Sequence, residues 1–181
     1  PIRDFEAFAG PRADIETLAN RGLAGIDGNI STALGIASQR RSTVAVMGDL
    51  AFLPDITGLI GATNINLRIL VINNDGGGIF STLPQAGVHG FEKIFGTPHG
   101  LDPVAIAKSM GVKAVTVDTI DQLRLEMSMP IRGLSVVVAN VPTRDTNANT
   151  LRELNRVIDS IRFNAKEANR LAPGDLHRAL T

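Results

Sequence analysis

The chain has 181 residues, in which 18 lysines and arginines balance 18 aspartates and glutamates, and 44% of the residues are hydrophobic. This length and apolar content suffice for the core of one ordinary domain. The balanced charge argues against nucleic acid as a partner, and no apolar run approaches the roughly 20 residues of a membrane helix. Cysteine is absent, which excludes disulfides and thiolate metal sites and favours a cytoplasmic protein.

Hydrophobic periodicity predicts strands that alternate with helices. In chain order it predicts a helix after the glycine-rich stretch 22–28, strands over 43–47 and 67–72, a helix from Asp102-Pro103, a helix from Thr119 to about Met129, a strand over 134–141, and a helix from near Asn147. The three strand runs are almost continuously apolar, which is typical of parallel strands buried on both faces. Asp102 is expected to cap its helix, and Thr119 to form a capping box with Gln122.

This alternation predicts a doubly wound α/β fold, with a mostly parallel sheet and helices on both faces. In such folds ligands bind at the carboxyl ends of the strands. Residues 1–163 are expected to form the domain. Residues 164–181 are expected to form a polar tail or a short helix.

Oxygen ligands follow two of the predicted strands. Asp49 ends the first, and Asn74 and the glycines 76–78 follow the second. If these strands are neighbours, the Asp49 carboxylate, the Asn74 amide and the Gly76 carbonyl supply three hard oxygen ligands, which is half of an octahedral magnesium shell. Phosphate and water normally complete such a shell, so this pattern indicates a phosphorylated ligand, which the bare glycines would let the backbone approach. The alternative is that Asn-Asp-Gly is only a turn.

A second alternative is a nucleotide-dependent oxidoreductase of the NAD(P)-binding Rossmann type. Gly22, Gly25 and Gly28 precede a predicted helix, and Asp49 follows at about the distance of a ribose-binding acid. The spacing is G-x-x-G-x-x-G, whereas the dinucleotide fingerprint is G-x-G-x-x-G, and no G-K-[ST] indicates a P-loop. The residues therefore argue against a bound nucleotide.

The motifs resemble those of thiamine-diphosphate enzymes, in which a Gly-Asp pair precedes Asn-Asn by some two dozen residues. Gly48-Asp49 and Asn73-Asn74 match this signature, but Leu50 replaces the glycine of the usual G-D-G. Together with residues 20–28 and 73–80, this departure resembles the menaquinone-pathway carboligases, over about residues 1–161. The resemblance implies thiamine diphosphate and Mg²⁺ or Mn²⁺, with Asp49, Asn74 and Gly76 as metal ligands. The implied cofactor contacts are Gly25, Ile26, Asp27, Gly48, Asp49, Leu50, Asn74, Gly76, Gly77 and Ile79.

The resemblance also implies a reaction, in which 2-oxoglutarate is decarboxylated and the succinyl carbanion adds to isochorismate. The activating glutamate of the family lies in a pyrimidine-binding domain of a second subunit, so this chain is expected to be a C-terminal fragment without a catalytic acid of its own. The family assembles as homodimers or homotetramers. The implied substrate contacts are Arg3, Arg21, Ile79, Phe80 and Leu83.

Local alternatives remain for several of these residues. Asp27 is expected to cap the helix near Asn29, and for Ile26 the alternative is an ordinary core residue. For Ile79, Phe80 and Leu83 the alternative is simple helix packing. His89, His99 and His177 lack metal-ligand spacing and are expected on the surface or in loops. Another thiamine-diphosphate decarboxylase, an acetolactate-type synthase or a non-catalytic domain also remain open.

Overall fold

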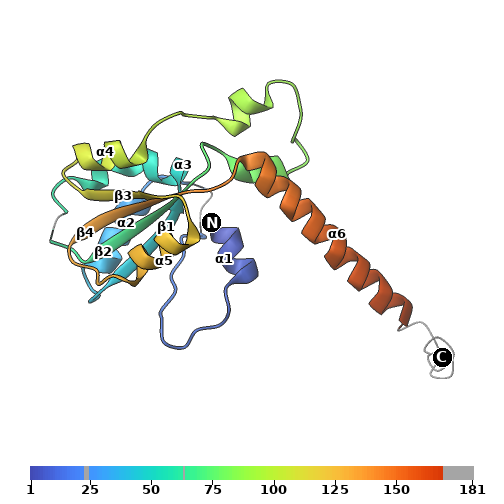
Figure 1. Cartoon of the computed structure of the whole chain (residues 1–181), viewed down its shortest axis with the longest axis horizontal. Helices are drawn as coiled ribbons and strands as arrows, with labels where there is room; N and C mark the ends of the chain where they lie inside the picture. Colours follow the sequence, from blue (N-terminus) through green and yellow to red (C-terminus); the bar gives the residue numbers. More distant parts are fainter. Residues whose placement is uncertain (23–24, 63, 169–181) are drawn as a thin grey trace.

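The centre of the fold is a sheet of four parallel strands (Figure 1). The computed structural model describes residues 1–22, 25–62 and 64–168. The strands are β1 (Thr43–Gly48), β2 (Leu67–Asn73), β3 (Lys113–Val117) and β4 (Leu134–Asn140), in the spatial order β1-β2-β4-β3. The three strands predicted from apolar runs are confirmed, and β1 lies beside β2, as the metal hypothesis requires.

The sequence pattern did not reveal β3. This strand is at the edge of the sheet and pairs with β4 in the described part of the chain. Ala114 and Val117 are buried, whereas Val115 is 40% exposed. A half-exposed edge strand therefore lacks the continuous apolar run that marks the other three.

Two apolar clusters cover the two faces of the sheet. The larger one joins strand residues to α2 (Asn29–Ala37), to the segment after β1 and to α4 (Pro103–Ser109), and its fully buried members include Phe52, Ile30 and Leu59. The smaller one joins Leu70, Val117, Val137 and Ala139 to Leu123 and Met127 of α5 (Ile120–Ser128). Successive strand residues point to opposite faces of the sheet, so the two clusters lie on opposite faces. Helices therefore pack on both sides of the sheet, and the predicted α/β architecture is confirmed.

The helices connect the strands and extend beyond the sheet (Figure 1). They are α1 (Ile2–Phe8), α2 (Asn29–Ala37), α3 (Asp49–Phe52), the 3₁₀ segment η1 (Leu53–Leu59), the 3₁₀ segment η2 (Gly78–Thr82), the π-helical turn η3 (Glu92–Gly96), α4 (Pro103–Ser109), α5 (Ile120–Ser128) and α6 (Arg144–Ala168). Among the residues that the structure describes, no helix is long and apolar enough to cross a membrane.

The helix starts follow the predicted caps with one exception. The Asp102 side chain accepts hydrogen bonds from two first-turn amides of α4, and Thr119 and Gln122 form both halves of the capping box of α5. Asp27 does not cap α2, so that prediction is wrong. Gly28 is the N-cap residue, with a φ of 73°, and no side chain caps the helix there.

The last helix, α6, projects away from the sheet (Figure 1). It begins at Arg144, three residues before the predicted start, and continues to Ala168, past the expected domain boundary at 163. Its first turns pack on η2 and bury Ala148, whereas Val157 and Ile161 of the predicted apolar stripe are 57% and 63% exposed. Residues 169–181, which make up most of the expected tail, lie outside the described residues.

Arg68, the second residue of β2, is a buried arginine that is only 5% exposed. Its Nη1 donates to the carbonyl oxygens of Glu126 (2.7 Å) and Met129 (2.9 Å), and its Nη2 donates to that of Pro130 (3.5 Å). The last carbonyls of a helix have no partner within the helix and carry partial negative charge. Arg68 therefore holds the carboxyl end of α5 against the sheet.

Replacing Arg68 by methionine, which has similar length and no donor, is expected to lower the free energy of unfolding by about 2 kcal/mol, because hydrogen bonds from a buried charged group to backbone carbonyls are lost. Urea unfolding of the chain measures this change. Arg124→Met is the control, since the Arg124 side chain is 77% exposed on the same helix and its loss is expected to change stability by less than about 0.5 kcal/mol. Equal stabilities of the two variants would contradict the role of Arg68.

Candidate functional site

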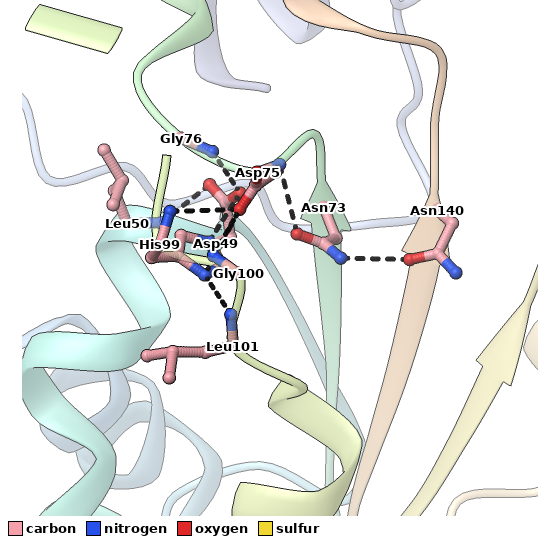
Figure 2. Close-up of polar contacts among 9 residues, drawn as sticks. All are labelled: Asp49, Leu50, Asn73, Asp75, Gly76, His99, Gly100, Leu101 and Asn140. Atoms are coloured by element: carbon pink, nitrogen blue, oxygen red, sulfur yellow. Dashed lines mark hydrogen bonds and ion pairs between the residues drawn. The ribbon is translucent and has the colours of Figure 1, made fainter. Parts of the chain in front are cut away.

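The predicted oxygen ligands emerge at one edge of the sheet because β1 and β2 run in parallel. Gly48, the last residue of β1, pairs in register with Ile72 of β2. Asp49 begins α3 directly after β1, and Asn74 begins the loop directly after β2. Figure 2 shows Asp49 and Gly76 meeting at this edge. The Asp49 side chain and the loop after β2 therefore meet at this edge of the sheet.

The Asp49 carboxylate is 2% exposed and accepts several hydrogen bonds. Its Oδ1 accepts from the Leu50 amide (2.7 Å), and its Oδ2 accepts from the Gly76 amide (2.8 Å). The His99 Nε2 lies 3.2 Å from the same Oδ2. Within the described part of the chain, no lysine or arginine pairs with this carboxylate. A buried carboxylate without such a partner is costly unless a cation compensates its charge.

The remaining candidate ligands belong to the loop that follows β2. Asn74 is half-buried. The residues that the structure describes contain no cluster of three histidine or acidic side chains that could hold a metal ion. A cation at Asp49 would therefore need further oxygen ligands, for which the Asn74 amide and the Gly76 carbonyl are the predicted candidates. This donor set suits a hard cation that carries phosphate.

Glycines 76–78 are required by the packing of the loop itself. A Cβ on Gly76 would lie 2.2 Å from the Gly96 carbonyl oxygen, and one on Gly77 would lie 2.4 Å from that of Phe95. Gly76 also has a φ of 132°, which L-residues rarely adopt. In the structure, these glycines let their loop pack closely against residues 95–97. The expected approach to a ligand remains a prediction.

Asp75 anchors a second loop to the site, a role that the sequence did not indicate. Its Oδ1 accepts hydrogen bonds from the amides of Gly100 (2.8 Å) and His99 (3.0 Å), as Figure 2 shows. The Gly100 hydrogen bond is the main reason that the pKa of Asp75 lies below its usual value. Asp75 also has a φ of 57°, so Asn-Asp-Gly does form a turn. The same turn carries the predicted metal ligands Asn74 and Gly76.

His99 was expected on the surface or in a loop, and it lies in the loop between η3 and α4 but not on the surface. Its side chain is only 11% exposed and contacts Asp49. The sequence contains no signal for this contact, since the two residues are 50 positions apart. His89 is exposed, as expected, and His177 lies outside the described residues.

A row of polar side chains ties the other strand ends together. The Asn73 Nδ2 donates to the Asn140 Oδ1 (3.0 Å), and the Asn140 Nδ2 donates to the Asp118 Oδ1 (2.8 Å). Asn73 also accepts from the Asp75 amide (3.3 Å). Asn140 could have been found by the strand-end rule, because it closes a predicted strand. Asp118 could not, because it follows the unpredicted strand β3.

Arg3 and Arg21 converge on one carboxylate. Arg3 lies in α1 and Arg21 in the segment before α2, and the Nη1 atom of each lies 3.1 Å from the Glu6 Oε2. All three side chains are exposed. The hydrogen bond from Arg21 is the main reason that the pKa of Glu6 lies below its usual value. The predicted substrate-binding arginines therefore lie together where they can bind a carboxylate.

The predicted apolar contacts are largely exposed. Ile26 is 52% exposed, so it is not an ordinary core residue of the described chain. Ile79 is likewise 52% exposed and Leu83 is 40% exposed. Phe80 packs on Phe95, with ring centroids 5.6 Å apart. Among the other predicted cofactor contacts, Gly25 and Asp27 are exposed, Gly48 and Leu50 are half-buried, and Gly77 is buried. Residues 23 and 24, between Arg21 and Gly25, lie outside the described residues.

Comparison with known proteins connects this geometry to one family. The family described as "Thiamine pyrophosphate enzyme, C-terminal TPP binding domain" matches residues 6–139. A curated relative from Rhodococcus erythropolis, named 2-succinyl-5-enolpyruvyl-6-hydroxy-3-cyclohexene-1-carboxylate synthase, is 41% identical over 85% of this chain and 29% of its own length. A relative of the same name from Lysinibacillus sphaericus is 45% identical over 87% of this chain and 28% of its own length.

Solved structures also match part of the chain. Benzoylformate decarboxylase from Polynucleobacter necessarius is 26% identical over 64% of this chain and 23% of its own, with a TM-score of 0.48. The chain spans less than a third of the length of the curated relatives that it matches. The family match and the curated relatives do not favour the nucleotide-binding oxidoreductase alternative.

Proposed function

Because the chain belongs to the thiamine pyrophosphate enzyme family as its C-terminal TPP-binding domain, we propose that it holds thiamine diphosphate through Mg²⁺ or Mn²⁺ at Asp49, Asn74 and the Gly76 carbonyl. The observation that carries the proposal is the Asp49 carboxylate, which is 2% exposed and pairs with no lysine or arginine in the described chain. A divalent cation bridging to diphosphate would balance this charge.

The cofactor supplies the electron sink that lets a 2-oxo acid lose carbon dioxide. The chain's own contribution is to bind and orient. Gly25, Asp27, Gly48, Leu50 and Gly77 are proposed to line the cofactor, together with the exposed side chains of Ile26 and Ile79. Exposed apolar side chains of this kind, with Phe80 and Leu83, would exclude water from the reacting centre once the pocket is complete.

The reaction that we propose is that of the menaquinone-pathway carboligase, 2-succinyl-5-enolpyruvyl-6-hydroxy-3-cyclohexene-1-carboxylate synthase, acting on 2-oxoglutarate and isochorismate. It is supported by the relatives of that name, which are 41% and 45% identical to most of this chain. The Arg3 and Arg21 pair supports it independently, because both substrates carry carboxylates and the guanidinium fork suits carboxylates. Glu6 already occupies this position in the structure.

A pyrimidine-binding domain of a second subunit is proposed to complete the pocket. The candidate site is an open edge of the sheet, whereas a hollow of about 680 Å³ lies elsewhere and is lined by residues of 81–93 and 145–152. A site that this domain lines on one side only fits a cofactor that binds between two domains. We place the enzyme in the cytoplasm as a homodimer or homotetramer, and analytical ultracentrifugation of the full chain tests the assembly.

The test of this function is turnover by the full-length enzyme. With thiamine diphosphate, Mg²⁺, 2-oxoglutarate and isochorismate, we expect carbon dioxide release and a succinyl adduct of isochorismate by mass spectrometry. Pyruvate in place of 2-oxoglutarate tests for an acetolactate-type synthase, and benzoylformate tests for a decarboxylase. Turnover of either one, without turnover of 2-oxoglutarate, would contradict the proposed substrates.

Arg21→Ala is expected to lower kcat/KM for the carboxylate substrates by about 10- to 100-fold, because a charged hydrogen bond contributes about 1.5–3 kcal/mol. Thiamine diphosphate should bind as in the unchanged enzyme. Steady-state kinetics and calorimetry measure the two effects. Arg12→Ala is the matched control, since Arg12 is an exposed arginine that pairs with Asp14. Kinetics that respond equally to both substitutions would contradict the substrate role of Arg21.

A further inference from the structure

His99 reaches Asp49 from a loop that the structure holds in place at several points. The loop follows η3 and turns through Thr97 (φ 42°) and Gly100 (φ 60°), both left-handed conformations. Asp75 fixes its backbone by accepting from the His99 and Gly100 amides, as Figure 2 shows. The His99 side chain is 11% exposed. The imidazole is therefore a fixed neighbour of the carboxylate.

The hydrogen bonds of the ring define its tautomer. The Leu101 amide donates to the His99 Nδ1 at 3.0 Å, so Nδ1 is the acceptor nitrogen. In a neutral imidazole the proton then resides on Nε2. That nitrogen lies 3.2 Å from the Asp49 Oδ2 and donates to it.

The hydrogen bond from His99 occupies one of the acceptor positions of the Asp49 carboxylate. A carboxylate has about four lone-pair positions, two on each oxygen. The Gly76 amide and the His99 Nε2 fill both positions on Oδ2. The Leu50 amide fills one position on Oδ1. Among the described donors, one lone pair on Oδ1 is therefore left for another partner.

We propose that His99 is a positioning residue for the metal ion: by occupying Oδ2 of Asp49, it leaves Oδ1 as the oxygen that binds the cation. This inference rests on the proposed function, because it assumes that Asp49 is a metal ligand. His99 acts through the carboxylate and does not bind the metal. Partners that orient a metal ligand typically change metal affinity by about 10- to 100-fold when they are lost.

The test measures Mn²⁺ affinity in the full-length enzyme with saturating thiamine diphosphate, from the electron paramagnetic resonance signal of free Mn²⁺. His99→Leu removes the donor and is expected to weaken Mn²⁺ binding by about tenfold. His99→Gln keeps an N–H donor at similar reach and is expected to stay within about threefold of the unchanged enzyme. The control is His89→Leu, at an exposed histidine, with no expected change.

The outcomes separate this inference from the proposed function. If the unchanged enzyme binds no Mn²⁺, or if Asp49→Asn binds it equally well, both are overturned. If Asp49→Asn loses Mn²⁺ while His99→Leu binds it as tightly as the unchanged enzyme or more tightly, only the His99 role is overturned. Melting temperatures of the His99 variants, measured without metal, test for a merely structural effect. A positioning role is supported if His99→Gln restores Mn²⁺ affinity while His99→Leu and His99→Gln are equally stable.

Discussion

Asp49→Asn is expected to abolish magnesium-dependent binding of thiamine diphosphate, with a loss of affinity on the order of 100- to 1000-fold, because removing one charge from a buried pair costs about 3–5 kcal/mol. The substitution preserves the size of the side chain. It exchanges a carboxylate oxygen for an amide nitrogen, which cannot accept a hydrogen bond. Because Leu50, Gly76 and His99 donate to both oxygens, either orientation of the amide also leaves at least one donor unpaired.

Isothermal titration calorimetry of the full-length enzyme, with and without Mg²⁺, measures this loss. Asp118→Asn is the matched control, because Asp118 follows β3 at the same edge of the sheet and accepts a hydrogen bond from Asn140. We expect this control to bind the cofactor like the unchanged enzyme. Metal-dependent binding that survives Asp49→Asn would show that the cation has other ligands.

Gly76→Ala is expected to lower the free energy of unfolding by about 3 kcal/mol or more. Two costs add at this residue. A φ of 132° is rarely adopted by an L-residue, which costs about 1–3 kcal/mol. The new Cβ would also lie 2.2 Å from the Gly96 carbonyl oxygen, a backbone atom, so the two loops must separate at a further cost of about 1–3 kcal/mol. Separation would displace the Gly76 carbonyl, so weaker metal-dependent cofactor binding is expected as well.

Gly111→Ala distinguishes the two costs. Gly111 has a φ of 77°, but a Cβ there meets no atom within 4 Å. We expect this control to lose only about 1 kcal/mol, from backbone strain alone. Urea unfolding measures both variants. A loss at Gly76 no larger than that at Gly111 would mean that the loops at 76–78 and 95–97 are not packed tightly.

The sequence by itself determined three of the four strands and the strand ends at which Asp49 and Asn74 lie. The runs that became β1, β2 and β4 are readable because strands buried on both faces are almost entirely apolar. The meeting of Asp49 with the loop after β2 was predictable as well, since parallel neighbours end at one edge. The caps at Asp102 and Thr119 were predictable for a similar reason, because capping depends on residues only two or three positions apart.

Only the tertiary structure decided the surroundings of Asp49. His99 reaches it across 50 positions of chain, through a loop held by Asp75, and no local pattern encodes that approach. The convergence of Arg3 and Arg21 on Glu6 likewise joins separate segments. Local hydrogen bonds and hydrophobic periodicity are short-range properties of a sequence. Contacts between loops depend on how the elements pack, so the partners of the carboxylate, and the one lone pair that they leave open, emerge only in the folded chain.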